Sequence, residues 1–217
     1  MQAPFNVRAG LGGTGMDWQS GIALERGYNI RPRPVRRIFG LNDDFPDLSE
    51  HLGGDLGPYK GWDRVNAPMI RHWCEAMGEH NPIYTDLQAA GAEGFDRVVA
   101  PPAMLQAWCM PGFGEQHPPG SERSEPMAVL PLLEAAGYPA VVAVNCEQEY
   151  ARYLEDGDEI YYRSSIESIS DKKTTALGVG FFVTQLCTYY DQRDEVVGTM
   201  RFRVLQYRPH DLPDTLS

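Results

Sequence analysis

Residues 78–86, GEHNPIYTD, gather side chains that can exchange protons. Glu79 supplies a carboxylate, His80 an imidazole and Tyr84 a phenol. An imidazole, with a reference pKa of about 6.5, suits proton transfer near neutral pH, whereas a phenol at about 10 is a poor base there. The segment therefore indicates acid–base chemistry in which Glu79 is the first candidate group.

A helix must hold this segment from its N-terminal side. Asn66 suits the helix cap and Pro68 suits the first turn. Four apolar residues then recur with helical spacing on one face: Ile70, Trp73, Cys74 and Met77. Gly78 is a typical residue at which to end such a helix. The candidate segment is thus expected in a loop directly after a helix, restrained by Pro82.

Further helices are expected before the last third of the chain. Residues 87–91 suit a short helix, and AMLQAWCM at 103–110 is apolar all round, which predicts a buried helix. Residues 111–126 are dense in Gly, Pro and Ser and predict a loop. Residues 127–137 return to helical spacing, although Pro131 disturbs it.

The last third is rich in β-branched and aromatic residues, with turn-like EDGD, SDKK and QRDE between the segments. Short turns predict an antiparallel meander of strands at 140–150, 158–170, 174–192 and 195–209. Gly178 and Gly180 predict a bend or bulge in the third strand. Helices followed by antiparallel strands indicate an α+β fold.

The composition is that of a globular protein, with 217 residues, 42% hydrophobic and 23% charged. The net charge of −11 gives no support to nucleic-acid binding, although local cations could still hold an anionic coenzyme A thioester. No apolar run approaches the roughly 18 residues of a membrane span, and no signal-peptide pattern opens the chain. A cytosolic protein without membrane contact is expected.

Three parts are expected along the chain: a flexible Gly/Pro/Arg-rich arm at 1–42, a domain at 43–210 and a tail at 211–217. GLGGTG in the arm spells GxGxxG, but no strand precedes it and no acid follows at the right distance, so a phosphate loop is rejected.

No metal site is expected, because the thiols and imidazoles lack the spacing of metal ligands. These residues are Cys74, Cys109, Cys146, Cys187, His51, His72, His80, His117 and His210.

Residues 78–83, GFDRVVAPPAML at 94–105 and EQEYARYLEDGDEI at 147–160 together resemble the MaoC-like, or hot-dog, dehydratase and hydratase superfamily. The likeness covers roughly residues 45–208. It is greatest to the N-terminal dehydratase-like branch of heteromeric enoyl-CoA hydratases, as in bacterial steroid side-chain degradation. The resemblance implies a curved antiparallel sheet wrapped around a central apolar helix, with AMLQAWCM as that helix.

The resemblance also implies roles for the residues of the opening segment. The active motif of the family reads Gly-Asp-x-Asn-Pro-x-His, in which the Asp acts on the attacking water and the His completes acid–base work. Glu79 stands at the Asp position and Tyr84 at the His position. A Glu side chain reaches further than an Asp, and a carboxylate misplaced by about 1 Å can cost on the order of 100-fold in rate. A phenol cannot replace imidazole as a base. The site is therefore expected to be inactive in its own right.

Substrate binding is expected to survive these changes. Asn81 and Pro82 can still shape the loop, and the backbone N–H of Ala103 stands at the oxyanion-donor position of the family. Pro102 occupies a place where many relatives carry His. The chain is thus expected to hold an acyl-CoA substrate and to need no cofactor.

These implications lead to one main hypothesis. The chain is expected to be the degenerate subunit of a heteromeric (R)-type enoyl-CoA hydratase or 3-hydroxyacyl dehydratase, acting on a bulky acyl-CoA such as a steroid side chain. A small MaoC-like partner would supply the Asp and His, and residues 111–137 would widen the acyl space.

Three alternatives stay open. A self-sufficient homodimeric hydratase would use Glu79, helped by Tyr84 or His80. A binding module without catalysis would present acyl-CoA to an OB-domain or thiolase-like protein. A hot-dog thioesterase would need a carboxylate on the long helix, and AMLQAWCM contains none.

Overall fold

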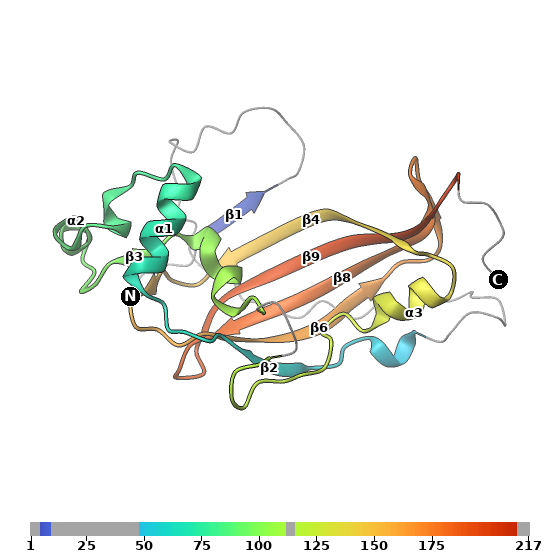
Figure 1. Cartoon of the computed structure of the whole chain (residues 1–217), viewed down its shortest axis with the longest axis horizontal. Coiled ribbons are helices and arrows are strands. Elements are labelled where there is room, and N and C mark those ends of the chain that lie inside the picture. Colours follow the sequence, from blue (N-terminus) through green and yellow to red (C-terminus); the bar gives the residue numbers. More distant parts are fainter. Residues whose placement is uncertain (1–4, 10–47, 112–115, 212–217) are drawn as a thin grey trace.

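An antiparallel sheet of seven strands carries the fold, in a computed structural model that describes residues 5–9, 48–111 and 116–211. The strand order is β1-β4-β9-β8-β6-β2, and β7 pairs with β8 outside this path (Figure 1). The bounds are β1 Phe5–Ala9, β2 Leu56–Lys60, β4 Ala140–Tyr150, β6 Tyr161–Ile169, β7 Lys173–Thr174, β8 Gly178–Tyr190 and β9 Val196–Pro209. A separate two-stranded sheet joins β3 (Val99–Ala100) to β5 (Leu154–Glu155).

Helices gather at the two ends of the large sheet (Figure 1). The end that bears the candidate segment carries α1 (Ala67–Met77), η2 (Pro82–Tyr84), α2 (Leu87–Ala92) and the 3-10 helix η3 (Pro102–Cys109). Near the other end lies α3 (Val129–Ala135), and a 3-10 turn, η1 (Ser49–His51), precedes β2. The described helices include none long and apolar enough to cross a membrane.

Two hydrophobic clusters bind these helices to the sheet. In the first, Met104, Leu105 and Trp108 of η3 pack with Ile70 of α1 and Met200 of β9. The second joins Val129 and Leu133 of α3 to strand residues that include Phe181, Val183 and Val204. The first cluster also contains Tyr84, so the candidate site is fixed by the packing of η3 and α1.

The expected helix before the candidate segment is confirmed. The Asn66 side chain accepts a hydrogen bond from the Met69 N–H at 2.9 Å, and Pro68 lies in the first turn. Gly78 ends the helix with a φ of 66°, a left-handed conformation that suits glycine. The short helix expected at 87–91 is also confirmed as α2, which Asp86 caps.

The central helix is present but differs from the prediction of a wholly buried helix. It is a 3-10 helix that starts at Pro102, and Ala103, Gln106 and Met110 at its margin are exposed. Proline at the first positions fits a helix start because no N–H is lost there.

The prediction of a simple meander is wrong for its first strand. The strands β6, β8 and β9 do follow one another as antiparallel neighbours, but β4 pairs with β9 rather than with β6. The reason is the connection at 151–160, which is too long for a tight hairpin and pairs part of itself, β5, with β3.

The bulge predicted at Gly178 and Gly180 is also wrong. The register between β8 and β9 runs without a shift through both residues and changes only near Tyr190. The glycines are required by close approach instead, because a Cβ at Gly180 would lie 2.1 Å from the Gln206 carbonyl oxygen of β9.

The two edges of the large sheet differ. Residues of the 116–126 loop cover the β2 edge, where the Glu122 N–H donates to the Pro58 carbonyl oxygen at 2.7 Å and Ser121 Oγ accepts from the Lys60 N–H at 3.1 Å. On the opposite edge, β1 pairs with residues 146–150 of β4. Residues 140–145 pair with β9 on one side, and on their other side no strand lies among the described residues. This β1 lies inside the segment at 1–42 expected to be an arm, and residues 1–4 and 10–42 of that segment lie outside the described residues.

A pair of glycine substitutions tests the close approach. Gly180→Ala should lower the free energy of unfolding by about 1–3 kcal/mol, because the added Cβ would meet the β9 backbone. Gly91→Ala in α2 is the control and should raise it by up to about 1 kcal/mol, because open space surrounds this helical position. Urea unfolding followed by circular dichroism measures both, and equal effects would contradict the assignment.

Candidate functional site

The loop after α1 uses its own polar side chains to hold its shape. Glu79 Oε1 accepts a hydrogen bond from the Asn81 N–H at 2.9 Å, and Asn81 Oδ1 accepts one from the Ile83 N–H at 3.2 Å. Pro82 begins the short helix η2, which Asn81 caps. Asn81 and Pro82 therefore shape the loop as predicted, and Glu79 takes part in the same turn.

Tyr84 lies in the hydrophobic cluster below this loop. Its side chain is only 7% exposed, and Tyr153 packs against the same cluster, close enough to affect the pKa of Tyr84. Burial raises the pKa of Tyr84 far above its ordinary value, with further contributions from Tyr153 and from the charge of Glu79. The phenol is therefore neutral at any physiological pH and can act as a hydrogen-bond donor but not as a base.

Ala103 lies on the first turn of η3, two positions after the N-cap Pro101. The first hydrogen bond of this helix runs from the Met104 N–H to the Pro101 carbonyl oxygen at 2.9 Å. The Ala103 N–H precedes that bond and so has no acceptor within the helix, and Pro102 has no N–H. Ala103 follows β3 in the chain, and β3 contacts η2, the short helix that contains Tyr84.

Tyr153 is a member of the site that the sequence does not single out. It lies just after β4, and Phe95 packs edge-on against it at 5.5 Å between ring centroids. A tyrosine in an aromatic-rich strand region gives no signal that distinguishes it from ordinary sheet packing. Only the three-dimensional fold brings it to Tyr84.

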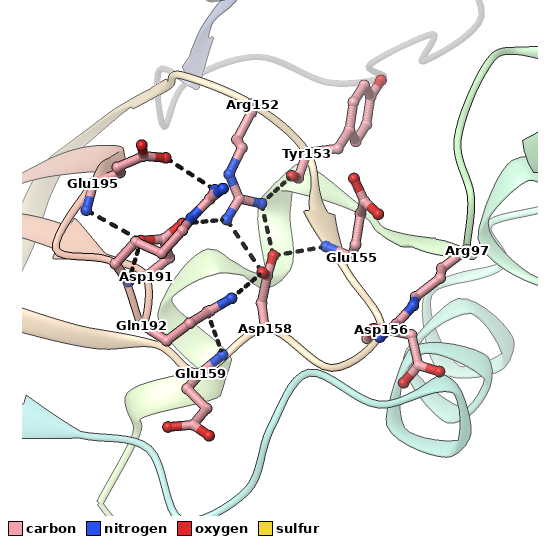
Figure 2. Close-up of polar contacts among 11 residues, drawn as sticks. Arg97, Arg152, Tyr153, Glu155, Asp156, Asp158, Glu159, Asp191, Gln192 and Glu195 are labelled. Carbon is pink, nitrogen blue, oxygen red and sulfur yellow. Dashed lines mark hydrogen bonds and ion pairs between the residues drawn. The ribbon is translucent and has the colours of Figure 1, made fainter.

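An ion-pair network supports the loop that bears Tyr153 (Figure 2). Arg152 Nη1 donates to Asp158 Oδ2 at 2.6 Å, and Arg152 Nη2 donates to Asp191 Oδ2 at 2.9 Å. The side chain of Asp191 is fully buried at the end of β8, and Arg193 Nη2 donates to it at 3.0 Å. The network therefore ties the connection between β4 and β6 to the turn between β8 and β9.

The pKa of Asp191 shows how well this carboxylate is compensated. Burial by itself would raise the pKa, but hydrogen bonds from Arg152 and from the backbone and side chain of Arg193 outweigh it. The pKa falls to about 2, below the ordinary value of 3.8. The carboxylate is therefore charged in the folded protein throughout the physiological range.

Two cavities are found away from the loop. The larger, of about 560 Å³, lies between Trp62, Arg64, Tyr161 and Arg163. The smaller, of about 360 Å³, lies beside Arg97 and Asp156. Neither is lined by Glu79, Tyr84 or Ala103. Among the described residues no group of histidine, cysteine or carboxylate side chains is arranged to hold a metal ion.

A family comparison now places the chain. The model for the FAS1-like dehydratase domain region matches residues 53–200, which include the loop, η3, the strands β4, β6 and β8, and the start of β9. The chain belongs to this family.

Curated relatives support the same placement. The chain is 48% identical over 169 residues to a probable enoyl-CoA hydratase alpha subunit from Thermomonospora curvata, with 77% of this chain and 53% of the relative covered. It is 40% identical over 164 residues to the 3-oxo-4,17-pregnadiene-20-carboxyl-CoA hydratase alpha subunit of Mycobacterium tuberculosis, with 75% and 51% covered. The FAS1-like chain thus spans about half the length of these relatives.

Solved structures establish the fold. The chain is similar to one in the ChsH1-ChsH2 complex from Mycobacterium tuberculosis, with 41% identity, a TM-score of 0.66 and coverage of 72% of this chain and 90% of that chain. A MaoC-like dehydratase has 18% identity and a TM-score of 0.51, over 74% of this chain and 43% of its own. The predicted hot-dog fold is therefore confirmed.

Removal of the Asp191 charge should change the acid sensitivity of the protein. Because its pKa is lower when folded than when unfolded, wild-type Asp191 contributes stability above pH 3.8 that is lost as the pH falls through about 2. The Asp191→Asn variant should be less stable than the wild type at neutral pH. Between pH 3.8 and about pH 2 it should lose less stability than the wild type does. Denaturant unfolding across this pH range measures the difference, and parallel curves for both proteins would contradict it.

Proposed function

We propose that this chain is the non-catalytic subunit of a heteromeric (R)-type enoyl-CoA hydratase or 3-hydroxyacyl dehydratase. The observation that carries the proposal is the buried, neutral Tyr84 at the position where the active motif has histidine. A partner chain of the MaoC-like kind supplies the Asp and His, and the reaction needs no cofactor beyond the coenzyme A thioester itself.

The end of the molecule that holds the loop suits an acyl thioester. The Ala103 N–H points from a helix start, where partial positive charge favours a developing oxyanion. Trp108 on the same helix is 4% exposed, and its indole N–H has no acceptor among the described residues. A buried unpaired donor costs about 1–3 kcal/mol, and an oxygen of a bound acyl group would offset that cost.

The open part of the β4 edge suits the partner. Val141 is 55% exposed there, and Val142 and Val144 are exposed as well, although β-branched apolar residues usually lie inside. An unpaired strand edge offers N–H and C=O groups to another strand. A partner strand on this edge would join the two sheets into one and cover the valines.

A bulky polycyclic acyl group is the proposed substrate. The support is the 40% identity to a protein named as a hydratase of 3-oxo-4,17-pregnadiene-20-carboxyl-CoA. The central helix η3 covers only one end of the sheet, and the segment at 116–137 packs at the β2 edge and around α3 instead of beside η3. The widening of the acyl space by residues 111–137 stays a proposal, because the described part of this segment packs away from η3.

The decisive assay compares the chain alone with the chain and a MaoC-like partner. Hydration of crotonyl-CoA and of a steroid enoyl-CoA should be absent with the chain alone and appear with the partner. Full turnover by the chain alone, abolished by Glu79→Gln, would favour a self-sufficient hydratase. Thioester binding without turnover in the complex would favour a module that presents acyl-CoA to an OB-domain or thiolase-like protein.

A charge on the open edge should prevent assembly. Val141→Lys should abolish co-purification with the partner, because a buried unpaired ammonium is strongly unfavourable. The matched control is Leu177→Lys, at a position that is also exposed but lies in the turn before β8. Size-exclusion chromatography of the mixed chains measures the effect, and retained assembly with Val141→Lys would refute this edge as the interface.

A further inference from the structure

We infer that Arg152 is a positioning residue for the proposed thioester site, fixing both the phenol pair of Tyr84 and Tyr153 and the Ala103 N–H. The inference rests on the proposed function for the meaning of that site. Arg152 contacts the site through the Tyr153 backbone, and the network in Figure 2 carries the inference.

The guanidinium of Arg152 acts directly on the loop that bears Tyr153. Arg152 Nη1 donates to the Tyr153 carbonyl oxygen at 2.8 Å while it also donates to Asp158 Oδ2. A planar guanidinium can serve these acceptors and Asp191 at once, because its N–H groups form a rigid fork. The backbone of Tyr153 is thereby held in place. The same restraint acts on its phenol, which packs against the cluster that contains Tyr84.

Asp158 carries the same restraint toward Ala103. Its Oδ2 also accepts from the Glu155 N–H at 2.9 Å, and Glu155 belongs to β5. The β5 strand pairs with β3 through Val99↔Glu155 and Ala100↔Leu154. Only Pro101 and Pro102 separate β3 from Ala103, and their fixed φ angles make this link stiff.

The backbone of Asp158 reaches the start of α1 as well. The Val65 N–H donates to the Asp158 carbonyl oxygen at 2.9 Å, and the Gly157 N–H donates to the Val65 carbonyl oxygen at 2.7 Å. Val65 immediately precedes the N-cap Asn66. The same turn thus anchors the helix whose far end presents Glu79.

Asp191 connects this arrangement to the sheet. It directly follows β8, and its buried carboxylate holds the Arg152 guanidinium from a rigid strand end. Arg193 bonds to the same carboxylate, but it is 60% exposed, and in the described part of the chain its recorded ion pairs are to Asp191 and Glu195 only. Arg193 therefore provides a matched control that shares Asp191 without restraining Tyr153 or Asp158.

The test compares Arg152→Lys with Arg193→Lys in the full chain. Lysine keeps the charge in both variants but lacks the fork. Arg152→Lys should speed amide hydrogen exchange in β3 and β5 by about tenfold and shift the Ala103 amide resonance in NMR spectra. Crotonyl-CoA, measured by calorimetry with the chain and its MaoC-like partner, should bind on the order of tenfold more weakly. Arg193→Lys should leave hydrogen exchange in β3 and β5, the Ala103 resonance and crotonyl-CoA binding unchanged.

Unchanged exchange and an unchanged Ala103 resonance in Arg152→Lys would overturn the inference, as would equal effects of the two variants. Should Arg152→Lys not fold, Asp158→Asn provides the second variant, because it keeps the side-chain shape and weakens the bonds to Arg152 and Glu155. Its expected changes have the same sign, and their absence would overturn the inference. Failure of the wild-type complex to bind both crotonyl-CoA and a steroid enoyl-CoA would refute the proposed function instead, while exchange still decides the role of Arg152.

Discussion

The burial of the Tyr84 phenol beside Tyr153 is the feature on which the proposed role of this chain depends. It holds a neutral donor at the place where the active motif of the resembling family has a base. Burial in the cluster around η3 raises the pKa of this phenol further above its ordinary value, so the packing strengthens the case that no base stands at this position. The loop geometry survives this change because Glu79 and Asn81 satisfy the backbone around Pro82.

The two ends of the large sheet carry different helices and different hydrophobic clusters. At one end, η3 and α1 pack over the strands and present the Ala103 N–H, while the ion pairs of Arg152 fasten the loops between strands. At the other end, α3 makes its own cluster. A buried carboxylate such as Asp191 is tolerated only because two guanidinium groups and two backbone N–H groups compensate its charge.

Local patterns in the sequence predicted much of this fold. The helical spacing from Ile70 to Met77, with Asn66 and Gly78 at its ends, gave α1 with its caps. The resemblance supplied the hot-dog fold and the loop residues. The pairing of β4 with β9 and the contact of Tyr153 with Tyr84 could not be predicted, because both depend on long-range topology. Asp158 and Asp191 were missed because an acid in a turn is ordinarily a solvated turn former, and Arg152 because its partners lie 6 and 39 residues away in the sequence.

The exposed valines of β4 also bear on how such a protein must be made. An uncovered apolar strand is a template for adding further strands, and identical chains provide them in abundance. Because β1 pairs only with residues 146–150, it does not cover these valines, and a second polypeptide on the edge would protect them from such addition. Synthesis of this chain together with its proposed partner would keep the edge covered.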